Sequence, residues 1–295
     1  MTAPHRTSKF SSQRLSLSLA EWGEETALPL VLVHGGRDQK RSWDRVAGRL
    51  ATGYRVIAFD LRGHGQSDWV SDGDYGVMDH VYDLASLIDQ LDLTKFTLIG
   101  HSLGGNIAIR YAGLFPNRVG RLVALEGLGP SPKMLAERQV QSVTARLTDW
   151  IEQRRSLSKR APRVMADLVE AEARMKAAFP HLPDDLIHHL TETGVKSNAD
   201  GTISWAYDPA GLGRSPSDLP HADFVHLWTQ ISCPTWLVYG AKSWASNPAE
   251  DGRAGHFQNA HVSVIADAGH WLHHDQYDDF MGQLERFLGS PAETP

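Results

Sequence analysis

A serine with glycines on both sides is the first feature of this sequence that could do chemistry. It lies in the stretch Gly100-His101-Ser102-Leu103-Gly104, between an apolar run at Phe96–Ile99 and apolar residues at helical spacing. A serine on so tight a turn between a strand and a helix is expected to have a strained, positive φ. Its hydroxyl would lie at the N-terminal end of the helix, where developing negative charge is stabilised. Ser102 is therefore the candidate nucleophile.

The elements that would position this serine follow a regular order. Apolar runs that predict strands recur along the chain, and most are followed by a segment with helical periodicity. This alternation predicts an α/β fold with a mostly parallel, doubly wound sheet and helices on both faces. The predicted strands cover Arg14–Leu19, Leu28–Val33, Tyr54–Phe59, Phe96–Ile99, Val119–Leu125, Thr235–Tyr239 and Val262–Ile265. The polar residues 1–12 are expected to form a loose start.

The alternation stops in the middle of the chain. Residues 130–229 contain no buried strand pattern, and helices are predicted over Met134–Leu157, Val164–Phe179 and Asp184–Thr193. A chain of 295 residues fits one large domain that carries an insertion. We therefore expect a core formed by residues 1–129 and 230–295, with a helical cap inserted at residues 130–229.

Chemically useful side chains come directly after several of the predicted strands. In open α/β sheets, ligands bind at the carboxyl ends of the strands, so residues that follow different strands can meet there. The polar residues in such positions are His34, Asp60, Ser102, Glu126, Ser243 and His270. Their shared position predicts one site at this edge of the sheet.

Composition narrows the classes of protein and partner. The net charge of −6 is mild and no run of basic residues stands out, so neither nucleic acid nor a membrane is an expected partner. Cys233 is the only cysteine, which excludes an intrachain disulfide and a cysteine-based metal site. No His-Glu-x-x-His pattern occurs, and neither a metal nor a cofactor is expected. Without an apolar leader or a spanning run, a cytoplasmic location is expected.

The motifs at the strand ends resemble those of the α/β-hydrolase family. The matching segments are His34-Gly35-Gly36, Asp60–Ser67, Gly100–Gly104 and Ala268-Gly269-His270, in the order that the family has them. The resemblance covers Leu15 to about Phe287, apart from the middle insertion, which looks like the family's variable cap. Haloalkane dehalogenases and epoxide hydrolases of this fold have an aspartate in the turn where this chain has Ser102, so the serine argues against both.

This resemblance implies the partners of the nucleophile. A serine hydroxyl needs a base to take its proton, and the family places its histidine after the last strand, where this chain has His270. The nearby residues His273 and His274 open the closing helix and are expected at the helix start or the rim. An oxyanion needs two N–H donors, which are expected from Gly36 and Leu103.

The acidic partner departs from the family's usual pattern. Most members carry an aspartate after the strand equivalent to Thr235–Tyr239, where this chain has Ser243. A neutral hydroxyl cannot stabilise an imidazolium as a carboxylate does. Some members carry the acid after the preceding strand, and this chain has Glu126 there. We therefore expect Glu126 to be the acid; the weaker candidates are Asp251, Asp267 and Asp275.

The expected function is hydrolysis of a carboxylic ester, or a related acyl compound, through a serine acyl-enzyme. The partner would be a small, ester-like molecule. Two alternatives remain open: a carbon–carbon bond hydrolase or lactonase with the same triad, and a non-catalytic ligand-binding receptor of the same fold, since the usual aspartate is missing. Five aromatic residues could line an apolar pocket or pack between cap and core: Trp205, Tyr207, Trp228, Trp244 and Trp271.

Overall fold

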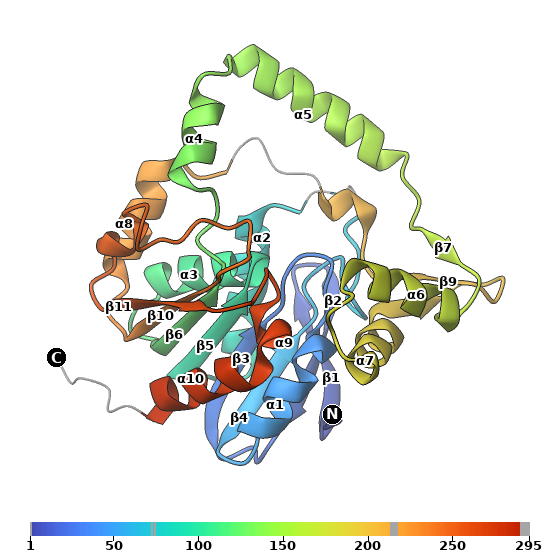
Figure 1. The fold of residues 1–295 in the computed structure, drawn as a ribbon, viewed down its shortest axis with the longest axis horizontal. Coiled ribbons are helices and arrows are strands. Elements are labelled where there is room, and N and C mark those ends of the chain that lie inside the picture. The colour runs from blue at the N-terminus through green and yellow to red at the C-terminus, as the bar shows by residue number, and fades with distance from the viewer. Residues whose placement is uncertain (1, 72, 74, 213–217, 290–295) are drawn as a thin grey trace.

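The main sheet has eight strands in the order β1-β2-β4-β3-β5-β6-β10-β11. It is seen in a computed structural model that describes residues 2–71, 73, 75–212 and 218–289. The pairings of β2 with β1 and with β4 are antiparallel, and every other pairing in the sheet is parallel. The predicted α/β fold with a mostly parallel, doubly wound sheet is therefore confirmed (Figure 1).

The central strands are buried because helices cover both faces of the sheet. Every residue of β5 and β10 is buried, which explains why their sequences are unbroken apolar runs instead of alternating patterns. The strands are β1 (Arg6–Ser12), β2 (Leu15–Trp22), β3 (Leu28–Val33), β4 (Tyr54–Phe59), β5 (Phe96–His101), β6 (Val119–Leu125), β10 (Thr235–Gly240) and β11 (Ala260–Ile265).

The helices divide between the two faces (Figure 1). On one face α2 (Val77–Gln90), α3 (Leu103–Leu114) and α8 (His221–Gln230) share a core cluster, and α8 packs against α3. On the other face α1 (Asp44–Leu50), α9 (Leu272–Asp275) and α10 (Tyr277–Gly289) pack in a second cluster. Both faces of the parallel strands are thus closed, and the carboxyl ends of the strands remain as the open edge.

The segment between β6 and β10 lies over that edge. It contains α4 (Pro132–Gln139), α5 (Val143–Ser158), β7 (Val164–Met165), α6 (Leu168–Ala178), α7 (Asp184–Gly194), β8 (Val195–Ser197), β9 (Ile203–Trp205) and the 3-10 helix η2 (Pro209–Leu212). In Figure 1, α4 and α5 arch above the sheet, while α6 and α7 stand beside it. The side chain of Gln39 donates a hydrogen bond of 2.8 Å to Thr193, which ties the end of α7 to the core. Residues 213–217 of the expected cap lie outside the described residues, and its boundaries stay a prediction.

Three details of the sequence-based prediction are wrong. Part of the expected loose start, residues 1–12, is the edge strand β1. Most of its residues are polar and exposed, so the sequence shows no apolar strand pattern there. The helix expected over Met134–Leu157 is two helices, because the Ser142 hydroxyl accepts a hydrogen bond from the N–H of Ala145 and begins a new helix. The cap is also not purely helical: β7, β9 and β8 form a small antiparallel sheet. Strands of two or three residues are too short to show an alternating pattern.

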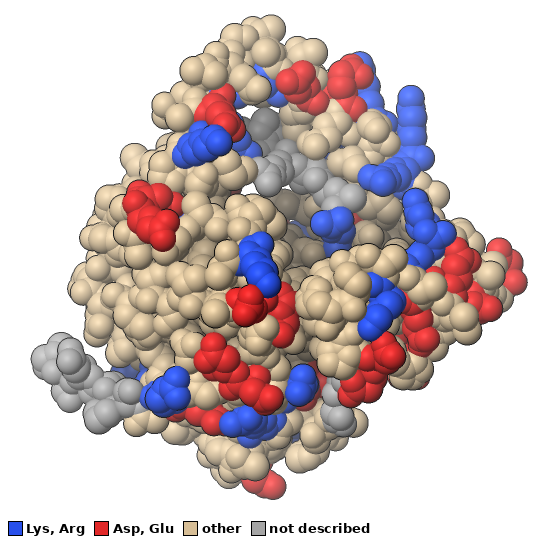
Figure 2. Space-filling view, in the orientation of Figure 1, with Lys and Arg blue, Asp and Glu red and all other residues tan. Residues whose placement is uncertain are grey.

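The surface carries charges of both signs. Acidic and basic side chains lie intermingled on the face drawn in Figure 2, and the surface is hollowed beneath α5. Within the described residues, none of the helices combines the length and the apolar character that crossing a membrane requires.

Candidate active site

The turn after β5 holds Ser102 in a strained conformation. Its φ is 53° and its ψ is −113°, so the positive φ expected from the sequence is confirmed. The glycines around it are required by close backbone contacts. A Cβ atom on Gly100 would lie 2.3 Å from the carbonyl oxygen of Gly104, and one on Gly104 would lie 2.2 Å from that of Val33. The serine hydroxyl is therefore presented at the start of α3, as the sequence predicts.

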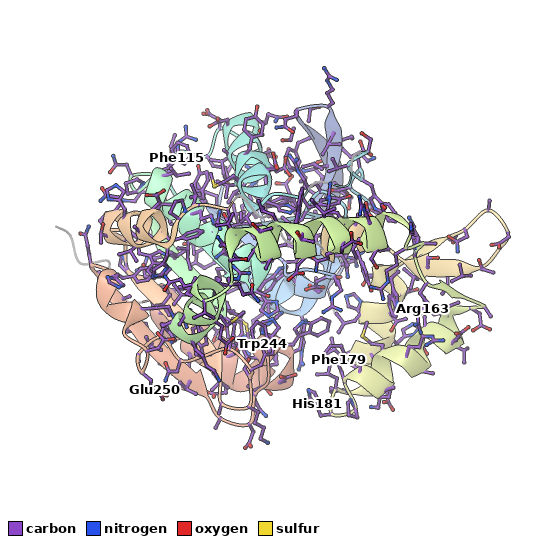
Figure 3. All side chains as sticks on the ribbon, turned by 90° about the horizontal axis from the view of Figure 1, so that it is seen from above. Phe115, Arg163, Phe179, His181, Trp244 and Glu250 are labelled. Carbon is purple, nitrogen blue, oxygen red and sulfur yellow. The ribbon has the colours of Figure 1, made fainter. Side chains whose placement is uncertain are left out.

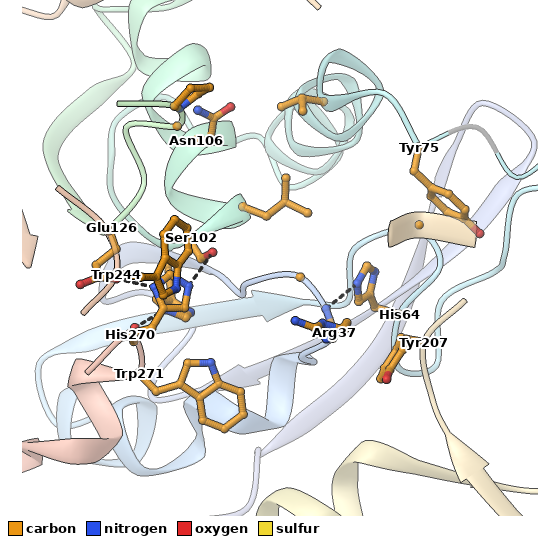
Figure 4. Close-up of a pocket in the computed structure, with 18 of the residues that line it drawn as sticks. Arg37, His64, Tyr75, Ser102, Asn106, Glu126, Tyr207, Trp244, His270 and Trp271 are labelled. Carbon is orange, nitrogen blue, oxygen red and sulfur yellow. Dashed lines mark hydrogen bonds and ion pairs between the residues drawn. The ribbon is translucent and has the colours of Figure 1, made fainter. Parts of the chain in front are cut away.

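His270 lies directly beside this serine (Figure 4). Its Nε2 atom is 3.0 Å from the Ser102 Oγ. With the proton on Nδ1, Nε2 is free to accept the hydrogen bond of the serine hydroxyl, which is the arrangement a general base needs. The backbone of His270 is held as well, because the Nε2–H of His101 donates a 2.8 Å hydrogen bond to its carbonyl oxygen.

Glu126 contacts the other ring nitrogen of this imidazole. Its Oε2 atom accepts a hydrogen bond from His270 Nδ1. Two further donors hold the carboxylate: the N–H of Gly240 at 2.9 Å from Oε1 and the hydroxyl of Ser243 at 2.6 Å from Oε2. The Glu126 side chain is fully buried. A buried carboxylate with donors on both oxygens is held in one orientation, toward the histidine ring.

The weaker acid candidates lie elsewhere. Asp251 binds Arg253 at 2.7 Å, and Asp267 pairs with Lys242 at 2.8 Å on the surface. Asp275 accepts the N–H of Gly269 at 2.7 Å. Among the described residues, none of these three carboxylates contacts His270. Of the four acids considered from the sequence, the structure thus brings only Glu126 to the histidine.

The two expected oxyanion donors are close to each other. A Cβ atom on Gly36 would lie 4.0 Å from a side-chain carbon of Leu103, and both residues line the same cavity as Ser102. The neighbouring Gly35 lies beside the candidate nucleophile, since a Cβ atom on Gly35 would be 3.3 Å from the Cβ of Ser102. In the described part of the chain, no protein acceptor binds the N–H of Gly36 or of Leu103. Their role as oxyanion donors stays a prediction.

Two buried histidines brace the loops around these donors. His64 accepts a 3.1 Å hydrogen bond from the N–H of Arg37 at Nε2, and His34 accepts one of 3.0 Å from the N–H of Leu61. Burial lowers the pKa of both rings, which keeps them neutral and able to accept. Asp60 holds the adjoining loop through the backbone and ammonium nitrogens of Lys40, both at 2.7 Å. These contacts brace the loops that follow β3 and β4.

A cavity of about 930 Å³ opens above Ser102, beneath the cap. Its size is within the range of small-molecule sites. Of the five aromatic residues noted in the sequence, it is lined by Trp205, Tyr207, Trp244 and Trp271. The fifth, Trp228, is instead buried against Phe257. Viewed from above, Trp244 and Phe179 face the opening from the core and from the cap (Figure 3).

Sequence reasoning missed three contributions to this site. It did not foresee that Ser243 donates to Glu126, that His101 holds the His270 carbonyl, or that arginines line the cavity. The first could have been sought, because the sequence places both Ser243 and Glu126 after predicted strands, at the same edge of the sheet. His273 and His274 do begin α9 as expected, but both are buried behind the site and not at its rim.

Comparison with known proteins defines the class. The sequence model of the alpha/beta hydrolase fold matches residues 29–277, so the chain belongs to the alpha/beta hydrolase family. It is 28% identical to the sn-1-specific diacylglycerol lipase of Mus musculus, over 93% of this chain and 85% of that protein.

Two solved structures show the same architecture. An esterase of M. tuberculosis is 25% identical, with a TM-score of 0.77 over 98% of this chain and 93% of the other. The thioesterase domain from the curacin biosynthetic pathway is 24% identical, with a TM-score of 0.80 over 95% and 99% of the two chains. Among the residues described here, no three His, Cys, Asp or Glu side chains are arranged to hold a metal ion.

Proposed function

We propose that this protein hydrolyses carboxylic esters through an acyl-enzyme on Ser102. One observation carries the proposal: a continuous line of contacts runs from Ser102 Oγ to His270 Nε2, at 3.0 Å, and from His270 Nδ1 to Glu126 Oε2. A nucleophile, a base and an acid in contact are what acyl transfer requires. The lipase and esterase relatives add support from outside the chain.

The reaction has two steps in this proposal. Ser102 Oγ attacks the carbonyl carbon while His270 Nε2 takes the hydroxyl proton and then delivers it to the leaving alcohol. A water molecule next gives a proton to His270 as its oxygen attacks the acyl carbon. The bond to Ser102 Oγ then breaks, this oxygen takes the proton back from His270, and the acid is released. Glu126 stabilises the imidazolium formed in each step. The N–H groups of Gly36 and Leu103 stabilise the negative oxygen.

The test is turnover of 4-nitrophenyl acetate and 4-nitrophenyl butyrate by the wild-type protein and by Ser102→Ala. We expect wild-type turnover and a loss of at least about 10³-fold in the variant. No wild-type turnover would contradict the proposal and favour a ligand-binding receptor. Turnover of a lactone or a vinylogous diketone, without ester turnover, would favour the other enzymatic alternatives.

A further inference from the structure

Arg37 is an arginine of the cavity that forms no ion pair with a carboxylate among the described residues. Arg37 directly follows Gly36, lines the cavity and is exposed there. Within the described residues its side chain forms neither an ion pair nor a hydrogen bond; only its backbone N–H is bound, to His64. Three further arginines of the cavity are paired: Arg110 with Asp218 at 2.7 Å, Arg174 with Glu170 at 2.8 Å and Arg253 with Asp251 at 2.7 Å.

Among the described residues, none of the carboxylates that line the cavity forms an ion pair with Arg37, and each has another hydrogen-bond partner. Glu126 is held by His270 and Ser243, and Asp218 by Arg110. Asp208 accepts the hydroxyl of Tyr75 at 2.6 Å. An unpaired guanidinium at the wall of a cavity attracts an anion that enters the cavity.

The backbone holds Arg37 close to the candidate nucleophile. Its φ is 62°, in the left-handed region that favours glycine, and the hydrogen bond to His64 fixes this conformation. Arg37 is two residues from Gly35, whose Cβ position lies 3.3 Å from the Cβ of Ser102. Since consecutive Cα atoms are about 3.8 Å apart, the guanidinium can reach a group a few bonds from a carbonyl carbon held at Ser102.

Two neutral donors share this cavity with Arg37. The indole of Trp271 and the phenol of Tyr207 both line it, and Figure 4 draws them around the same opening as Arg37 and Ser102. In the described part of the chain, neither the Trp271 N–H nor the Tyr207 hydroxyl has a hydrogen-bond partner. Both groups can donate a hydrogen bond to a ligand held in the cavity.

We propose that Arg37 binds a negatively charged group of the substrate, a carboxylate or a phosphate. The substrates would be esters or thioesters that carry this group a few bonds from the scissile carbonyl. This inference rests on the proposed function and deepens it. A guanidinium fits such groups with two parallel hydrogen bonds, and a purely apolar ester would leave its charge unpaired beside the apolar part of the substrate.

The test compares substrates that differ in one charge. Mono-4-nitrophenyl adipate carries a carboxylate on the acyl side and 4-nitrophenyl heptanoate does not. On the leaving-group side, 4-acetoxybenzoate and 4-acetoxyphenyl phosphate carry the charge and 4-tolyl acetate does not. In Arg37→Gln we expect kcat/KM to fall roughly 10- to 100-fold, mainly through KM, for at least one charged ester. The matched neutral ester should change less than threefold, and Arg37→Lys should recover part of the loss.

A second variant separates this effect from a general change in charge. Lys242 is close in sequence to Ser243, lies outside the cavity lining and pairs with Asp267 at 2.8 Å. Lys242→Gln removes the same unit of charge, and we expect less than a twofold change for every ester. Equal losses on charged and neutral esters in Arg37→Gln would overturn the inference, as would unchanged kcat/KM for all three charged esters.

A binding measurement keeps the inference testable if no ester is turned over. Calorimetric titration of 4-acetoxybenzoate, mono-4-nitrophenyl adipate and 4-acetoxyphenyl phosphate into Ser102→Ala, and into the same protein with Arg37→Gln, needs no catalysis. We expect at least one charged ester to bind roughly 10- to 100-fold more weakly without the guanidinium. Equal affinities for all three would overturn the inference, whereas weaker binding without turnover would count against the proposed function alone.

Discussion

The hydroxyl of Ser243 donates a 2.6 Å hydrogen bond to Oε2 of Glu126, the same oxygen that contacts His270. Ser243 stands where most members of the family carry the acid, and here it holds Glu126, the acid that follows the neighbouring strand β6. This is possible because β10 pairs directly with β6, with Val238 opposite Leu125. The two strand ends place the hydroxyl and the carboxylate side by side.

The Glu126–Ser243 contact leads to a prediction about charge. Glu126→Gln keeps the shape of the side chain but removes the negative charge that stabilises the imidazolium, so we expect ester turnover to fall about 10²- to 10⁴-fold. Ser243→Ala removes one neutral donor and should cost less than about tenfold. The measurement is kcat for 4-nitrophenyl butyrate in both variants. Equal losses, or a larger one in Ser243→Ala, would contradict the assignment of Glu126.

The close backbone packing at the serine turn predicts a stability effect. A methyl group on Gly104 would meet the carbonyl oxygens of Val33 and His34 at 2.2 and 2.5 Å. Because backbone has to move, we expect Gly104→Ala to lower the free energy of unfolding by about 1–3 kcal/mol or more. Thermal or denaturant unfolding measures this. The control is Gly53→Ala, where no atom lies within 4 Å, and a similar loss there would contradict the steric explanation.

Buried histidines behind the site predict loss of stability in acid. Burial, with the charges of Arg45 and His189, lowers the pKa of His274 from 6.5 to about 3. Between these values the unfolded chain binds a proton that the folded protein does not. Stability is therefore unaffected by this group above pH 6.5 and falls as the pH drops from 6.5 toward 3, by up to about 1.4 kcal/mol per pH unit.

The measurement is the free energy of unfolding against pH for the wild type and for His274→Gln. Between pH 6.5 and 3, the free energy of unfolding of the variant should fall less steeply with decreasing pH, by up to about 1.4 kcal/mol per pH unit. Identical slopes for the two proteins would contradict the prediction. An NMR titration of the wild-type His274 ring checks the same point without a substitution. A midpoint near 6.5 would be the opposite of what we expect.

Sequence patterns predicted the parts of the fold that are buried on both faces. β3, β5 and β10 are apolar runs because helices cover them on either side, and their ends located Ser102. The edge strand β1 was missed because most of its residues face solvent. The break between α4 and α5 depends on one capping residue, Ser142, within a chain of helix-forming residues.

Strand order limits how far the site can be predicted. The sequence places Glu126 and Ser243 at strand ends, but only the pairing of β6 with β10 makes them neighbours. The free guanidinium of Arg37 was missed for a similar reason. Whether an arginine is paired depends on residues distant in the chain, as with Arg110 and Asp218.

Labelling with a fluorophosphonate probe tests the central claim most directly. The probe forms a bond to an activated serine, so peptide mapping by mass spectrometry identifies the nucleophile. We predict modification of Ser102 in the wild type and none in Ser102→Ala. Two other serines line the same cavity, Ser131 and Ser246. Labelling of either one with Ser102 unmodified, or undiminished labelling of Ser102→Ala, would contradict the account.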